Sequence, residues 1–241
     1  MLKLTLPLLL IACALLSNCT SYSSGGRNTK DYWGDGAGPQ GFGTVIIDAG
    51  HGGKDSGARS RSTGALEKNL ALNVAKALRS ELSGSFRVVM MRDDDSFIEL
   101  GQRAARASKY TDGVLVSIHW NEAKSYIHGP ETYYWRVDSY GMAERVQQSL
   151  SATVGSSNSR GLVRRRLRLT RNTEIPSILV ECGYLSNKAE AARAVDPSYQ
   201  RKIARAISNA IKTQAAQGDS GMGALPKSIH APLSKNGDHR E

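Results

Sequence analysis

Short apolar runs recur through the middle of the chain and predict a buried sheet. Residues 44–47, 113–118 and 177–180 are nearly continuous runs of β-branched and aliphatic residues, a pattern typical of strands that are covered on both faces. The other strand-like segments are residues 86–91, 132–137 and 162–169.

Helical periodicity appears between and after these runs. Leu70, Val74, Leu78 and Leu82 recur every four residues from Glu67 onward, which predicts an amphipathic helix. Further helices are predicted at residues 98–109 and 142–150, and two more close the domain, the last with a stripe of Tyr199, Ile203, Ile207 and Ile211. This alternation predicts the α/β class, with a single domain in which a mostly parallel, twisted sheet is flanked by helices on both faces.

The first residues have the pattern of an export signal. Lys3 precedes an apolar run over residues 4–16, which is too short to cross a bilayer as a helix. The following Leu-Ser-Asn-Cys resembles the lipobox of bacterial lipoproteins, in which the signal is removed and the new N-terminal Cys is acylated. We therefore expect residues 1–18 to be a lipoprotein signal peptide and Cys19 to carry the lipid. The alternative is an ordinary secretory signal with an incidental Cys.

Composition divides the remaining chain into three parts. Residues 19–42 are rich in Ser, Gly and polar residues and are predicted to form a flexible tether. Residues 217–241 have a similar composition and predict a disordered tail, which leaves residues 43–216 as one folded domain. After signal removal and lipidation, Cys182 is the only free thiol, so no intramolecular disulfide is available.

The chain is strongly basic, with a formal net charge of +10 that becomes +9 when Lys3 leaves with the signal. Such a charge favours an anionic partner, either cell-wall polymer or a membrane surface, and export argues against nucleic acid. We expect a periplasm-facing lipoprotein in the cell envelope. Thr20 stands where an Asp would favour retention in the inner membrane, so the sequence favours the outer membrane.

Four polar residues lie at strand ends or at the helix start that follows one. They are His51 after the first strand, Glu67 at the first helix, His119 at the third strand and Glu181 at the last buried strand. Residues at the carboxyl ends of parallel strands converge on one edge of a sheet. Two imidazoles and a carboxylate form a recognised catalytic zinc set, and a further carboxylate can act as the base.

Each of the four also has a simpler interpretation. The alternative for His51 is a loop residue without a special role in a Gly turn. The alternative for Glu67 is an acidic residue in the first turn of a helix, where the helix dipole favours it. The alternative for His119 is a buried histidine whose hydrogen bonds are made within the core. The alternative for Glu181 is an ion pair with a nearby arginine.

Six motifs carry a family resemblance. In chain order they are IDAGHGGKD (47–55), EKN (67–69), RDDD (92–95), SIH (117–119), LTRN (169–172) and VECGYLSN (180–187). Together they resemble the zinc-dependent N-acetylmuramoyl-L-alanine amidases of the amidase type 3 family, over about residues 44–212. The resemblance implies one Zn²⁺ per chain held by His51, Glu67 and His119, with Glu181 as the catalytic carboxylate. It also implies peptidoglycan as the substrate, cut at the amide between N-acetylmuramic acid and L-alanine.

The sequence departs from the family pattern at two positions. Trp120 stands where a smaller residue is common, and Cys182 stands where an apolar residue is more usual. Cys182 lies in an apolar strand end without a neighbouring His, so we interpret it as a buried core thiol rather than a nucleophile. Some family members block the zinc with a helical insertion, but here only residues 121–130 separate His119 from the next strand. We therefore expect an open site; an activator protein is compatible with the sequence but not required.

Two further features concern charged residues. Asp48 is the nearest candidate in sequence for orienting the imidazoles, with capping of the Gly turn as the alternative. Arg164, Arg166 and Arg168 fall on one face of a predicted strand. A solvated face is the default interpretation, and a surface that binds anionic cell-wall polymer is the alternative.

Two other functions fit the same residues. The first is another zinc-dependent peptidoglycan peptidase, because a metal and a base serve any amide. The second is a non-catalytic, lipid-anchored wall-binding module, which has no need of Glu181.

Overall fold

The computed structural model describes residues 34–155, 161–235 and 237, and the predicted signal peptide and Cys19 lie outside these residues. Six strands form one sheet in the order β2-β1-β3-β6-β4-β5. The centre is formed by β1 (Thr44–Ala49), β3 (Gly113–Asn121) and β6 (Ser177–Tyr184), all parallel, as is β2 (Arg87–Met90). Only β4 (Glu131–Tyr134) pairs antiparallel to β6, and β5 (Leu162–Arg164) runs parallel to β4. The predicted single domain with a mostly parallel sheet is confirmed.

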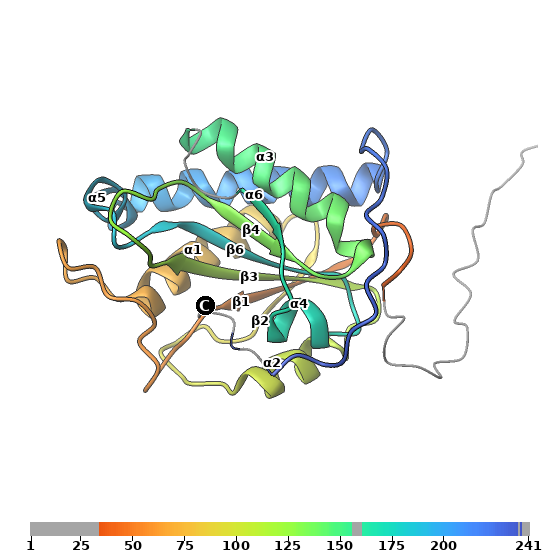
Figure 1. The fold of residues 1–241 in the computed structure, drawn as a ribbon, viewed down its shortest axis with the longest axis horizontal. Helices are drawn as coiled ribbons and strands as arrows, with labels where there is room; N and C mark the ends of the chain where they lie inside the picture. The colour runs from red at the N-terminus through yellow and green to blue at the C-terminus, as the bar shows by residue number, and fades with distance from the viewer. Residues whose placement is uncertain (1–33, 156–160, 236, 238–241) are drawn as a thin grey trace, which may run out of the picture.

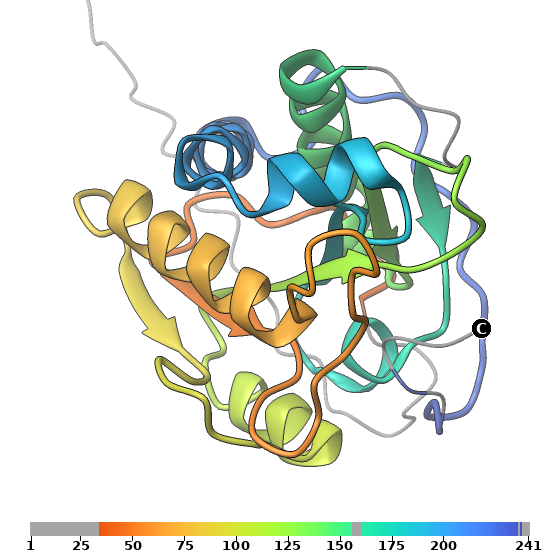
Figure 2. The same ribbon diagram turned by 90° about the vertical axis from the view of Figure 1, so that its left-hand side faces the viewer.

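Helices cover both faces of the sheet (Figure 1). One face is covered by α1 (Glu67–Leu82), α3 (Tyr140–Val154) and α6 (Pro197–Gln217), with α6 packed between the other two (Figure 2). The short helices α2 (Leu100–Ala107) and α4 (Arg168–Asn172) lie on the other face. The remaining elements are a 3-10 turn at Val137–Ser139 and α5 (Lys188–Ala194). Among the described residues, no helix combines the length and hydropathy that crossing a bilayer requires.

The two faces of the sheet differ in composition because side chains alternate along each strand. Toward α1, α3 and α6, the central strands direct only apolar side chains, which join the largest core cluster. Toward α2 and α4, the same strands carry Ile46, Leu115 and Leu179 in their middle and polar side chains at their carboxyl ends. On β3, for example, Leu115 is followed on that face by Ser117 and His119, all buried. The buried ionisable side chains of these strands, Asp48, His119 and Glu181, therefore lie at the carboxyl edge of this face.

Cys182 lies on the apolar face and is fully buried. Burial raises the pKa of its thiol well above the ordinary value, with the nearby carboxylate of Glu181 adding to the effect. The interpretation of Cys182 as a core thiol is confirmed, because a buried neutral thiol is a poor nucleophile.

The predicted strand at 162–169 is wrong beyond Arg164. Residues 168–172 form α4 instead, and the Leu167 amide donates to Thr170 Oγ1 at its start (3.1 Å). A local side-chain hydrogen bond of this kind favours a helix start over a continued strand. Arg164, Arg166 and Arg168 therefore do not share a strand face.

The same three arginines contact the C-terminal segment, which the composition had predicted to be disordered. Their guanidinium groups donate to main-chain carbonyls within residues 227–235. In return, Ser234 Oγ donates to the carbonyl of Arg166 (2.6 Å), and the Ser234 side chain is buried. This segment lacks apolar periodicity, and it is hydrogen bonds from arginine side chains that attach its backbone to the domain.

Candidate metal centre

His51 lies in a tight turn directly after β1. Its φ of 62° places it in the left-handed region, where a non-Gly residue is uncommon. The φ of the next residue, Gly52, is also positive, at 123°. Two arginine side chains hold this turn through its carbonyl groups: Arg92 Nη2 donates to Gly50 (2.6 Å), and Arg103 Nη2 donates to His51 (2.6 Å). The strained backbone is thus fixed by charge-assisted hydrogen bonds.

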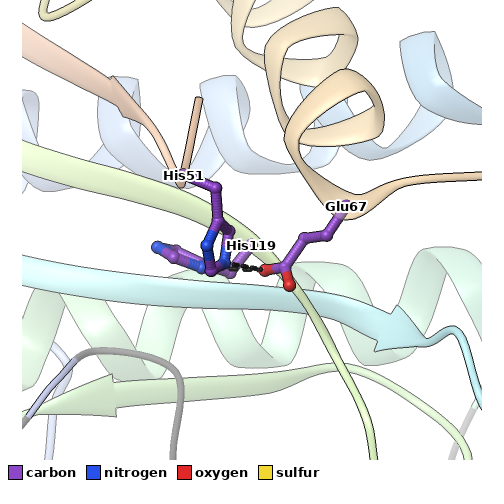
Figure 3. Close-up of side chains that lie close together, drawn as sticks. All are labelled: His51, Glu67 and His119. Atoms are coloured by element: carbon purple, nitrogen blue, oxygen red, sulfur yellow. Dashed lines mark hydrogen bonds and ion pairs between the residues drawn. The ribbon is translucent and has the colours of Figure 1, made fainter. Parts of the chain in front are cut away.

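Glu67, the first residue of α1, faces two imidazoles (Figure 3). Its Oε1 atom lies 2.9 Å from His51 Nε2 and 2.9 Å from His119 Nδ1. One ligand atom from each of the three residues lies within 4.8 Å of the other two, and all three side chains are buried. The three predicted ligands therefore converge from a strand-end turn, a helix start and a strand.

Glycines make room for this cluster. A Cβ on Gly57, whose φ is 62°, would lie 2.4 Å from Glu67 Oε2 and 2.6 Å from the His51 ring. A Cβ on Gly50 would lie 2.3 Å from the His119 ring. Both contacts are closer than a real Cβ tolerates, so any side chain at either position would displace a ligand-type residue.

The pKa shifts of Glu67 and His119 suit the binding of a cation, whereas the shift of His51 opposes it. Burial alone would raise the pKa of Glu67, but hydrogen bonds from His119 and His51 outweigh it and hold the pKa well below the ordinary value. Burial lowers the pKa of His119, which favours its neutral imidazole. Burial opposes protonation of His51, yet Glu67 and Asp55 together raise its pKa. An ionised carboxylate beside two imidazoles is the donor set that zinc prefers, and the residues present fit that metal.

Asp55, rather than Asp48, contacts a ligand-type imidazole. Its Oδ2 atom lies 2.9 Å from His51 Nδ1, on the opposite side of the ring from Glu67. A carboxylate at that position fixes the ring orientation, as is usual around metal-bound histidines. Asp55 lies four residues after His51 in the sequence, and that spacing across a Gly turn is the signal that could have identified it.

Asp48 has a different role from the one expected. Its carboxylate accepts from Arg103 Nη1 (2.6 Å) and Ser117 Oγ (2.6 Å), and it is fully buried. It points toward α2 and so meets Arg103 before any imidazole. Arg103 in turn donates to the carbonyls of Ala49 and His51, so Asp48 supports the turn indirectly.

Arg103 was not identified from the sequence. It lies on the buried side of α2 with Ala104 and Ala107, and a cation among apolar helix positions was the available signal. Arg92 was noticed only as part of a family motif. Its guanidinium donates to the carbonyls of Ala49 and Gly50, which places it beside Arg103 behind the same turn.

Glu181 lies next to His119 across the sheet, because the two residues are register partners in the parallel β3–β6 pair. It lines a cleft of about 440 Å³ together with Glu67, Trp120 and Asn121. It is not one of the three clustered ligand-type residues, but it shares their cleft. The loop between β3 and β4 contains no helix, so no insertion of that kind covers the cleft.

Comparison with known proteins places this arrangement in a family. Over 170 residues the chain is 34% identical to N-acetylmuramoyl-L-alanine amidase LytC of Bacillus subtilis, covering 68% of this chain and 34% of LytC. The chain thus spans about a third of that relative's length.

Two solved amidase structures are similar to this chain in fold and in sequence. The catalytic domain of CwlV, an N-acetylmuramoyl-L-alanine amidase from Bacillus (Paenibacillus) polymyxa var. colistinus, superposes with a TM-score of 0.67 at 38% identity, over 70% of this chain and 96% of that one. The CwlD amidase of Clostridioides difficile, solved in complex with the GerS lipoprotein, gives a TM-score of 0.67 at 33% identity, over 71% and 97%. The family profile described as N-acetylmuramoyl-L-alanine amidase matches residues 45–213, and the chain belongs to that family, Amidase_3.

Proposed function

We propose that this protein hydrolyses the amide bond between N-acetylmuramic acid and the L-alanine of the stem peptide in peptidoglycan. The observation that carries the proposal is the convergence of His51, Glu67 and His119 within 4.8 Å, in a cleft that also contains Glu181. Family membership supplies the substrate class, since LytC and CwlV are named for this reaction.

His51, Glu67 and His119 would hold one zinc ion. When bound, zinc lowers the pKa of a water molecule toward about 7 and polarises a carbonyl group. The lowered pKa values of His119 and Glu67 favour the neutral imidazole and the ionised carboxylate that such binding requires. Asp55 keeps the His51 ring in place through Nδ1.

Glu181 serves as the general base and then as the general acid. Its carboxylate takes a proton from the attacking water and returns it to the departing amine of L-alanine, so the proton count balances. Its position beside His119 in the sheet register supports this role, because both side chains project from one face at the carboxyl edge.

The experiment is mass spectrometry of the soluble products from purified peptidoglycan, with and without a zinc chelator. Free stem peptides with a new L-alanine N-terminus, lost on chelation, are expected. Fragments cut within the stem would instead indicate a zinc peptidase, and bound zinc without any product would indicate a wall-binding module.

We also propose that the site works without a partner. The structure of CwlD was solved with a lipoprotein, GerS, so partner binding occurs within the family. Here the loop before β4 lacks a helix that could cover the cleft lined by Glu67 and Glu181, which supports this proposal. Turnover by the purified protein alone supports this; activity that appears only after adding a second protein contradicts it.

We also propose, from the pattern of residues 1–19, that the protein is located in the cell envelope as a lipoprotein. Mass spectrometry of the protein isolated from its own cells should show an acylated N-terminal Cys19. An unmodified N-terminus after residue 18 or elsewhere would indicate an ordinary secretory signal instead.

A further inference from the structure

A cluster of cations covers the outer surface of α1 and α6, away from the candidate metal centre. We call it the α1/α6 cationic face, and it consists of Lys76, Arg79, Arg201, Lys202 and Arg205. All but the half-buried Arg79 are exposed. Two hollows, of about 310 and 500 Å³, open on this face and share Arg201 in their linings.

Acidic groups do not balance this charge. The 21 residues of α6 include no Asp or Glu. Nearby Glu81 lies 3.4 Å from Arg205, and Asp196 caps α6 by accepting from the Ser198 amide (2.8 Å). Within the described part of the chain, no ion pair involves the remaining four cations, Lys76, Arg79, Arg201 and Lys202. Four positive charges therefore face solvent on two neighbouring helices.

The shape of this face favours an extended partner. α1 and α6 lie side by side (Figure 2), and their five cations line two neighbouring hollows that share Arg201, rather than a single pocket. A single small anion would be held by groups that converge, whereas a surface of many negative charges is matched by a spread array. An anionic bilayer surface attracts Lys and Arg in this additive way.

The path of the chain points to the same partner. Residues 38–41 run along the C-terminal end of α6, where the Gly41 amide donates to the Ala215 carbonyl (2.8 Å) and Gln40 Nε2 donates to the Ala216 carbonyl (3.0 Å). The chain thus enters the domain at the C-terminal end of α6, ten residues or about 15 Å of helix beyond Arg205. A lipid on Cys19, as proposed above, would hold the domain close to a membrane.

We propose that the α1/α6 cationic face docks the domain on the anionic phospholipid headgroups of a membrane. Glu67 begins α1, nine residues before Lys76, so about 14 Å of helix separates the cleft from the nearest docking cation. Docking on this face therefore leaves the cleft open to the wall.

The test uses the polypeptide from residue 20 to 241, so that no attached lipid contributes to binding. Co-sedimentation is measured with phosphatidylcholine vesicles, with and without phosphatidylglycerol, at several salt concentrations. Binding is expected only with phosphatidylglycerol and should weaken with salt. Lys76→Gln/Arg201→Gln should weaken it by about fivefold for each cation removed.

The matched control is Arg106→Gln/Lys109→Gln, which removes one Arg and one exposed Lys from the α2 region on the other side of the sheet. It should change binding by less than about twofold. Equal losses in the two double variants, or equal binding to neutral vesicles, would overturn the proposal. Tighter binding to soluble polyphosphate than to vesicles, at equal phosphate concentration, would assign the face to a phosphate polymer and overturn the membrane assignment.

Amide hydrolysis of solubilised peptidoglycan by Lys76→Gln/Arg201→Gln should equal that of the wild type. The vesicle readout does not depend on hydrolysis, so failure of the proposed enzyme function and failure of membrane docking give separate results.

Discussion

The two faces of the central sheet differ in the polarity of the side chains that the same strands direct toward them. Toward α1, α3 and α6 the side chains of the central strands β1, β3 and β6 are apolar, and they join the largest core cluster. Toward α2 and α4 they become polar at the carboxyl ends, where buried Asp48, His119 and Glu181 lie on neighbouring strands. The face toward α1, α3 and α6 therefore provides most of the buried apolar surface, while the face toward α2 and α4 keeps buried polar groups paired with one another. Substitutions on the two faces should therefore separate stability from chemistry.

The largest expected effect is on turnover. Glu181→Gln keeps the size of the side chain but removes the base, so kcat should fall by about 10²- to 10⁴-fold. Zinc content, measured by atomic absorption, and the melting temperature should stay near wild type. Glu122→Gln is the matched control, since Glu122 is an exposed carboxylate in the same cleft, and its kcat should change little. If zinc is lost in Glu181→Gln, then Glu181 is a ligand and the role assigned here is wrong.

A second substitution tests Arg103, whose side chain binds the Asp48 carboxylate and the His51 carbonyl behind the polar face. Arg103→Leu leaves the fully buried Asp48 carboxylate without its ion-pair partner, and such a loss costs about 3–5 kcal/mol of the free energy of unfolding. Zinc affinity should fall as well, because the His51 carbonyl loses its donor. Urea unfolding and a zinc titration measure the two effects. Adding Asp48→Leu should restore part of the stability but not the affinity; recovery of both would show that Arg103 acts only through its ion pair.

On the apolar face, Leu78→Ala should lower the free energy of unfolding by about 2–5 kcal/mol, because Leu78 is completely buried in α1 against the sheet. Zinc affinity and kcat of the folded fraction should not change. Urea unfolding and a zinc titration are again the measurements. A loss of zinc affinity here would break the comparison, since it would mean that packing on the apolar face also sets the ligand geometry.

Sequence patterns predicted the central strands and singled out His51 and His119 for the same physical reason, whereas the ligand roles of His51, Glu67 and His119 were implied by the family resemblance. β1, β3 and β6 are buried on both faces and so are continuous apolar runs, and a polar residue at the end of such a run stands out. His119 at the end of β3 is an example.

The parts that sequence did not predict depend on contacts between distant residues. Arg103 lies 52 positions after His51, whose carbonyl it binds, and no local pattern links them. The segment 227–235 has no apolar period, yet Arg166 and Ser234 join it to the domain through their side chains and backbone. Hydrogen bonds to main-chain carbonyls leave no signature in side-chain patterning, which is why a disordered tail was expected there.

The smallest expected effect is a dependence on pH that is specific to the polar face. Burial would raise the pKa of Asp48, but the ion pair with Arg103 and the hydrogen bond from Ser117 outweigh it and lower the pKa below the ordinary value. A carboxylate with a lowered folded pKa stabilises the protein above its unfolded pKa, about 3.9, and this stabilisation is lost as pH falls through the folded pKa. The difference in unfolding free energy between wild type and Asp48→Asn should therefore be constant from pH 7 to about pH 5 and should shrink below about pH 4. Urea unfolding with a chelator present measures this difference without a contribution from metal release.

In the Leu78→Ala variant, by contrast, the difference in unfolding free energy from wild type should not depend on pH, because an apolar side chain does not titrate. A gap for Asp48→Asn that stays constant to pH 3 would mean that its carboxylate gains nothing from Arg103, and the polar face would then owe its stability to packing, as the apolar face does.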